Sequence, residues 1–138
     1  MAVFQKFHCL PEHLAEKVHN LGADSLKVVL TDTAPNAATD TVLADIADLS
    51  TGGGYTAGGA AVTVTSSAQS GGTYALVGDD LVFTAAGGTI GPFRYPTLYN
   101  DTAANDELIG YWDYGSSITL QDGETFTLDF GASILTLA

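Results

Sequence analysis

The chain has 138 residues, of which 16 are acidic and four are basic, so its formal net charge at pH 7 is −12. This length is typical of one domain with a single core, and the 46% of apolar residues excludes a disordered chain. Four scattered cations cannot supply the footprint that nucleic acid needs, and no apolar run approaches the roughly 20 residues that span a bilayer, so neither is an expected partner.

The first residues show no basic segment followed by a long apolar stretch, so the sequence predicts no signal peptide and synthesis in a cytoplasm. Cys9 is the single cysteine of the chain. It allows no internal disulfide, which is typical of a reducing compartment.

The first predicted element is a helix that begins near Pro11 and ends before Gly22. Leu14, Val18 and Leu21 recur at helical spacing, proline suits a first turn, and glycine can form the C-terminal cap. A helix of at most three turns is marginal alone, so its apolar stripe must pack on the domain or on a partner subunit.

The apolar residues ahead of this helix have no obvious strand partner in the sequence pattern. We therefore expect Phe4, Phe7 and Leu10, together with Leu14 and Val18 of the helix stripe, to form a docking element for another protein. Residues 1–25 form this arm and helix as part of the same domain, and residues 26–138 form a β-sandwich domain.

A strand is predicted over residues 26–31, where Leu, Val and Thr dominate. The following stretch, residues 32–61, stays open. Val42, Leu43, Ile46 and Leu49 fit a short helix, whereas Val42 and Ile46 with Ala44 between them also fit a strand.

From residue 61 onward, short runs rich in β-forming residues alternate with glycine pairs and Asp-Gly turns. The predicted strands span residues 61–67, 73–78, 80–85, 92–99, 107–114, 117–120, 124–130 and 133–137. This pattern predicts a mainly β protein with one N-terminal α-helix, built as an antiparallel, jelly-roll-like β-sandwich.

The clearest predicted hairpin joins residues 117–120 to residues 124–130 across an Asp-Gly turn. Its apolar residues alternate with Thr and Asp, so one face is expected to be buried and the other wet.

Residues that carry chemistry are few. His8, Cys9, His13 and His19 lie close together in sequence, but their spacing matches no zinc pattern, and His13 and His19 would fall on opposite faces of the predicted helix. No Gly-x-Ser-x-Gly sequence is present, and the glycines of residues 52–57 precede a predicted strand rather than a helix, which excludes a dinucleotide fingerprint. We expect no enzyme activity, no metal and no cofactor.

Acidic groups at Asp79-Asp80, Asn100-Asp101 and residues 105–107 could in principle hold calcium or hydrolyse a glycosidic bond. None matches a calcium-loop pattern, and turn chemistry accounts for Asp and Asn at these places.

Aromatic residues concentrate in two neighbouring predicted strands: Phe93, Tyr95, Tyr99, Tyr111, Trp112 and Tyr114. Alternation predicts the first three on one face, and Trp112 and Tyr114 opposite Tyr111. A cross-strand aromatic core is the first interpretation, and a platform for a protein partner or a sugar is the second. The five residues from Tyr95 to Tyr114 are therefore candidate interface residues as well.

Several segments resemble small virion proteins of tailed double-stranded DNA bacteriophages. They are FQKF (4–7), HLAEKVHNLG (13–22), LKVVLTDTAP (26–35), GPFRY (91–95), YNDT (99–102), LIGYWDYGSS (108–117) and DGETFT (122–127). The resemblance implies a capsid cement, or decoration, protein with a β-sandwich subunit and no catalytic residues.

On this resemblance, the expected partner is the major capsid protein of the same phage, and the expected location is the outer surface of the capsid. Self-association, most simply as a dimer, would strengthen the grip on the shell. The alternative is a tail or head-fibre adhesin domain that binds a host surface glycan or protein through the aromatic strands.

Overall fold

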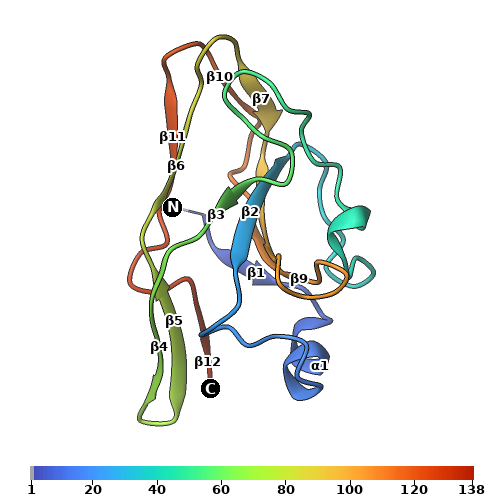
Figure 1. Ribbon diagram of the computed structural model, residues 1–138, viewed down its shortest axis with the longest axis vertical. Coiled ribbons are helices and arrows are strands. Elements are labelled where there is room, and N and C mark those ends of the chain that lie inside the picture. Colours follow the sequence, from blue (N-terminus) through green and yellow to red (C-terminus); the bar gives the residue numbers. More distant parts are fainter. Residues whose placement is uncertain (1) are drawn as a thin grey trace.

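The computed structural model describes residues 2–138 and is mainly β, with antiparallel sheets, as Figure 1 shows. Its strands are β1 (Phe4–Lys6), β2 (Leu26–Thr31), β3 (Ala60–Ala61), β4 (Val64–Ser70), β5 (Thr73–Gly78), β6 (Leu81–Thr84), β7 (Ile90–Phe93), β8 (Tyr95–Asn100), β9 (Leu108–Trp112), β10 (Ile118–Leu120), β11 (Thr125–Leu128) and β12 (Leu135–Leu137). The helices are α1 (Leu10–Ala15) and the 3₁₀ turn η1 (Leu43–Asp45). The mainly β, antiparallel prediction is confirmed, whereas the jelly-roll-like sandwich stays a prediction.

A five-stranded antiparallel sheet with the order β1-β9-β8-β2-β3 forms the centre of the molecule. The prediction for residues 26–31 is confirmed, because β2 has these bounds and pairs with β8 along its whole length. The N-terminal arm contributes β1 to this sheet, where Phe4 pairs with Trp112 and Lys6 with Gly110. The expectation that the arm lacks a strand partner is therefore wrong, because that partner lies about a hundred residues downstream and no local pattern reveals it.

The second half of the chain folds back on itself as a nested series of antiparallel pairs. β8 pairs with β9, β7 with β10, β6 with β11 and β5 with β12, and β4 adds to the outer side of β5. Figure 1 shows the β4–β5 hairpin extending from the body at the end of the molecule where β12 lies.

This nesting corrects the predicted hairpin. β10 and β11 do not pair with each other, because residues 121–124 form a corner between two different strand pairs. The predicted alternation is nevertheless present, since Leu120, Phe126 and Leu128 are buried while Thr119 and Thr127 are exposed.

Two clusters of buried side chains cover opposite faces of the five-stranded sheet. The larger lies between this sheet and the smaller sheets, and joins Val28, Leu98 and Trp112 to residues such as Phe83 and Phe126. The smaller cluster, on the other face, consists of Phe7, Val29, Ile46, Tyr99 and Leu108. Burial on both faces explains the nearly continuous apolar sequence of β2.

Segment 32–61, for which the sequence left helix and strand as alternatives, contains the 3₁₀ turn η1. A glycine-rich stretch follows this turn and is hydrogen-bonded to the sheet. The Tyr55 hydroxyl accepts a hydrogen bond from the backbone N–H of Leu30 (3.1 Å) and donates one to the carboxylate of Asp48. Gly59 packs so close to β2 that a Cβ there would lie 1.9 Å from the carbonyl oxygen of Val28. The glycines of this stretch therefore serve close backbone packing.

The helix is shorter than predicted. It ends at Ala15, and Lys17 adopts a left-handed conformation with φ of 66°, so the chain turns away before Val18 and Leu21 can continue the stripe. Its end is closed locally, because the N–H of Glu16 donates to Glu12 and that of Val18 to His13. Leu10 and Leu21 still reach the core, but from different segments.

Candidate interaction surface

The predicted interface residues divide by burial. Phe7, Leu10, Tyr99 and Trp112 are buried, with exposed fractions of 0, 1, 1 and 3%. They form part of the cores on the two faces of the sheet, so their side chains contribute almost nothing to the exposed surface of the monomer. The other predicted interface residues are half-buried: Phe4, Leu14, Val18, Tyr95, Tyr111 and Tyr114.

Phe4 and Leu10 line a groove of about 450 Å³ between β1 and β12, which we call the strand groove. Its remaining walls come from residues 3–6 of the N-terminal arm and residues 133–137 around β12. Consecutive side chains of a strand point to opposite faces of the sheet. A groove that is lined by every residue of a strand therefore runs along the edge of that strand and not across a face of the sheet. The strand groove therefore lies between the free edges of two sheets.

The topology agrees with this position. β1 is the terminal strand of the five-stranded sheet, and β12 is a terminal strand of the sheet ordered β12-β5-β4. The N–H of Phe7 donates to Ile109 (3.1 Å), so the backbone of Gln5 also faces β9 while those of Phe4 and Lys6 face outward. No backbone hydrogen bond joins Phe4 or Lys6 to a segment other than β9 within residues 2–138.

Leu14 and Val18 line a second hollow of about 590 Å³, the helix groove. It lies between the loop after α1 and the β4–β5 hairpin, and is also lined by Lys17, Tyr74 and Leu137. Leu137 lines both grooves, so they meet at β12.

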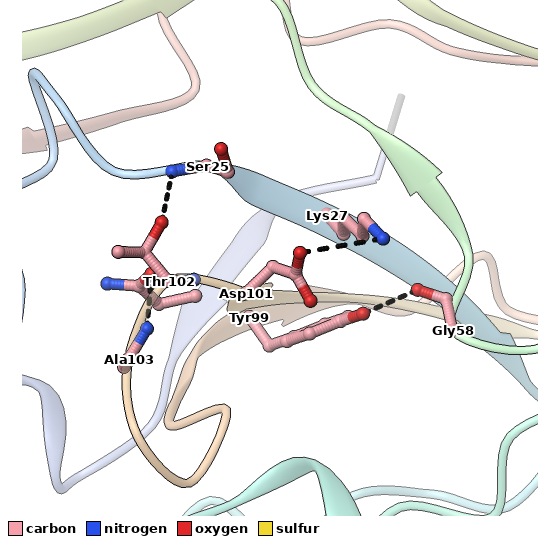
Figure 2. Close-up of polar contacts among 8 residues, drawn as sticks. Ser25, Lys27, Gly58, Tyr99, Asp101, Thr102 and Ala103 are labelled. Carbon is pink, nitrogen blue, oxygen red and sulfur yellow. Dashed lines mark hydrogen bonds and ion pairs between the residues drawn. The ribbon is translucent and has the colours of Figure 1, made fainter.

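The cations of the chain are distributed unevenly with respect to these grooves. Lys27 pairs with Asp101 (3.5 Å) and Arg94 with Asp113 (2.7 Å), the former drawn in Figure 2. Lys6 in the strand groove and Lys17 in the helix groove have no carboxylate partner within residues 2–138. In a chain of net charge −12, the unpaired side-chain cations thus line the two grooves.

A buried polar cluster supports the loop that forms the helix groove. The Asn100 side-chain amide donates to Asp24 (2.7 Å) and lies 2.9 Å from Nδ1 of His19, while its oxygen accepts from the N–H groups of Thr102 and Ala103. These contacts fix the orientation of the amide, so Nδ1 of His19 is an acceptor and the neutral ring carries its hydrogen on Nε2.

The rings of His13 and His19 lie 5.7 Å apart, centre to centre, which corrects the prediction that they occupy opposite helix faces. The helix ends between them, and the chain reverses at Lys17. Burial, and next the neighbouring His13, lower the pKa of His19. Nδ1 of His13 and Nε2 of His19 are buried and have no hydrogen-bond partner among residues 2–138.

The other sequence-predicted groups have structural partners. Glu107 accepts from the N–H of Asn105 (2.8 Å), as expected of a turn residue. Asp80 accepts from the N–H of Phe130 (3.0 Å), which is 50 residues away, so it joins two distant segments and does not close a local turn as predicted. Burial raises the pKa of the half-buried Cys9 thiol. No group of three or more His, Cys, Asp or Glu side chains in residues 2–138 is arranged to hold a metal ion.

The predicted aromatic strands are split between the two faces. Phe93 belongs to the large core, whereas Tyr99 and Tyr111 belong to the smaller cluster on the opposite face, because the chain changes strand at Arg94. Tyr95 and Tyr111 form a half-buried edge-to-face pair with ring centres 6.4 Å apart, and the Arg94 guanidinium lies over the Tyr95 ring.

Comparison of the chain with protein-family models, with curated proteins and with solved structures found no match. No helix in the part of the chain that the structure describes is long and apolar enough to cross a membrane.

Sequence reasoning placed Phe4, Leu14 and Val18 near this surface but missed its other wall. Lys6 and residues 133–137 could have been recognised, because both lie in short β-forming runs that could become edge strands. Local sequence patterns do not show which strands pair, so they could not show that these two distant edges lie side by side.

Proposed function

We propose that the protein is a non-enzymatic capsid cement protein of a tailed double-stranded DNA phage. It would bind outside the head and bridge neighbouring copies of the major capsid protein. The observation that carries this proposal is the pair of grooves that meet at Leu137, because a small protein with adjoining docking grooves can hold two surfaces at once. The resemblance of the sequence segments to small virion proteins supports the same function.

Bridging would act through multivalency. Once one groove is occupied, the second contact becomes intramolecular, so the effective concentration of its partner is high and weak contacts combine into a strong grip. A dimer would double the number of contacts with the capsid, and it is the association state that we favour. The nested strand pairing supports the proposed jelly-roll-like sandwich, a compact body suited to an exterior position.

The charge supports an exterior location. A net charge of −12 disfavours contact with packaged DNA and keeps the protein soluble at the high concentration that assembly requires.

The test is the stoichiometry and position of the chain in purified particles, measured by quantitative mass spectrometry and by electron microscopy of heads. We expect many copies per particle in a regular array on the head. A few copies at the tail would overturn the proposal.

The structure changes how a docking variant should be designed. Removing residues 1–22 would delete β1 and the buried Phe7 and Leu10, so loss of binding would only report unfolding. Val3→Asp is a better variant, because Val3 is 69% exposed at the mouth of the strand groove. We expect it to fold normally and to decorate heads poorly, with Val82→Asp, at a 53% exposed site outside both grooves, as the matched control.

An adhesin domain is the second candidate function, and the half-buried Tyr95–Tyr111 pair with Arg94 favours it. Aromatic faces stack on sugar rings and on protein partners. Glycan-array binding that is lost in Tyr95→Ala would support this alternative. Absence of the chain from heads would be required as well.

A further inference from the structure

We propose that the strand groove binds an extended, acidic peptide segment of another protein, which adds to the free edge of β1 as an antiparallel or parallel strand. This inference does not depend on the phage function, because it concerns the chemistry of one edge. It assigns both the conformation of the ligand and the position of one of its charges.

The conformation follows from the backbone. Phe4 and Lys6 direct their N–H and C=O groups away from β9 and carry no other backbone hydrogen bond within residues 2–138. A row of such groups is a template for one more strand. The wall formed by residues 133–137 lies along the same groove, so a peptide that enters must be extended to fit between the two edges.

The side chains of the groove set the sequence of the peptide. Val3 is 69% exposed and Phe4 is half-buried beside it, so apolar residues of the peptide would cover them. Consecutive residues of a strand point to opposite faces, so the two covering residues would be neighbours in the peptide, one on each face. Lys6 shares the face of Phe4, so the peptide residue beside Lys6 would lie two positions from the one that covers Phe4. Pairs of β-branched or aromatic residues across strands would add to the affinity.

The expected acidic residue of the peptide follows from Lys6. This lysine lines the groove without a carboxylate partner in the described chain, although acidic residues outnumber basic ones by 16 to four. Within residues 2–138, no Asp or Glu lines the strand groove, and salt screens repulsion from carboxylates more than about 8 Å away at physiological ionic strength. A Glu or Asp of the peptide beside Lys6 would therefore be attracted locally.

The occupant is assigned to another protein rather than to a second copy. The sequence of β1 is Phe-Gln-Lys, so a second copy paired through β1 would bring another lysine and no carboxylate to Lys6. A separate acidic peptide supplies that carboxylate and can span both edges of the groove.

The test uses a library of random ten-residue peptides displayed on yeast, sorted for binding to the folded full chain labelled with a fluorophore. We expect enriched peptides with two neighbouring apolar residues and a Glu or Asp two positions from one of them. Binding should weaken roughly five- to tenfold in Lys6→Glu and be unchanged in Lys17→Glu, the matched charge reversal in the helix groove. Equal binding to Lys6→Glu and the wild type, or no enrichment, would overturn the proposal.

Strand addition is tested separately with a synthetic form of the best peptide. Two N-methylated forms of the peptide are compared, one methylated at the odd and the other at the even backbone positions. Only one of the two sets of N–H groups faces β1, so only one form loses the donors that pair with β1. We expect that form to lose about tenfold or more in affinity and the other to bind nearly as well. Equal affinities of the two forms would show that no strand is added and would overturn the proposal.

Two further measurements exclude trivial explanations. Thermal unfolding midpoints of Lys6→Glu and Lys17→Glu should match that of the wild type, because both side chains lie on the surface. Analytical ultracentrifugation without peptide should show that the Lys6→Glu variant keeps the association state of the wild type. A change of that state would assign the groove to a second copy and overturn the proposed occupant.

Discussion

The Tyr99 hydroxyl, on the central strand β8, donates a 2.6 Å hydrogen bond to the carbonyl oxygen of Gly58 in the glycine-rich stretch, as Figure 2 shows. Gly58 in turn donates its N–H to Asp48 (2.7 Å), whose other oxygen accepts from Tyr55. Two tyrosines thus anchor a segment that has little secondary structure of its own to the five-stranded sheet.

Replacing Tyr99 with Phe should remove this anchor while keeping the ring packing. We expect a loss of about 1 kcal/mol in the free energy of unfolding, because the Gly58 carbonyl loses its buried donor. Chemical denaturation measures it. The control is Tyr95→Phe, at a half-buried tyrosine whose hydroxyl makes no hydrogen bond within residues 2–138, and it should change stability little.

The same tyrosines predict a loss of stability in alkali. Burial raises the pKa of Tyr99 to about 12 and raises that of Tyr55 as well. The unfolded phenols ionise near pH 10, so their contribution is fully present below that pH and is lost as the pH rises from about 10 towards 12. Unfolding curves between pH 9 and 11, at roughly half-unit steps, should show a shallower decline in Tyr99→Phe than in the wild type. Identical slopes would contradict the assignment.

In acid, the buried His19 should act in the opposite direction. Its pKa is lowered by burial and next by His13, against the opposing pull of Glu107 and Asp24. The unfolded imidazole binds a proton near pH 6.5 while the folded one resists it, so stability is full above that pH and falls as the pH drops below it. In His19→Gln, the unfolding midpoint should be lower at pH 8 but change less between about pH 7 and 5.5. A wild-type midpoint that is constant over that window would refute this.

Gly59 tests the close contact between the glycine-rich stretch and β2. In Gly59→Ala the new methyl group would lie 1.9 Å from the Val28 carbonyl oxygen, on a backbone with φ of 83°. We expect a loss of about 3 kcal/mol or more. Gly71→Ala has a similar φ of 59° but open space around it, so it should cost only about 1 kcal/mol. The difference between the two variants isolates the steric clash.

The Cys9 thiol should react slowly in the folded protein. Burial raises its pKa, and its sulfur lies 3.9 Å from the carbonyl oxygen of Leu108. Because the thiolate is the reactive form, alkylation by iodoacetamide at pH 8 should be slower than in the urea-unfolded chain. Similar rates in the two states would show that the thiol is accessible and unperturbed.

Local sequence patterns predicted faces better than partners. The alternation from Ile118 to Phe130 correctly separated buried from exposed side chains, and β2 was predicted with its true bounds. Alternation reports only which face a residue occupies, so it could not show that β10 pairs with β7 and β11 with β6. The same limit concealed the pairing of β1 with β9.

The candidate surface was predicted in part for the same reason. Apolar residues at Phe7 and Leu10 indicated that the arm docks on something, but composition does not distinguish a domain's own core from a partner. The helix prediction failed at Lys17, because spacing of Leu14, Val18 and Leu21 cannot show that the chain turns left-handed between them.

The nested pairing also has a consequence for how the chain acquires its structure. The turn at residues 101–107, closed by the Asn100 N–H to the Glu107 carbonyl (3.0 Å), joins the most local pair, and each outer pair closes only a small additional loop once the inner one exists. We expect the β8–β9 pair to form first and the outer pairs to form after it, in order of their distance from this turn. During synthesis, β5 and β6 would emerge well before β11 and β12, so an arrested or truncated chain presents bare strand edges that invite aggregation.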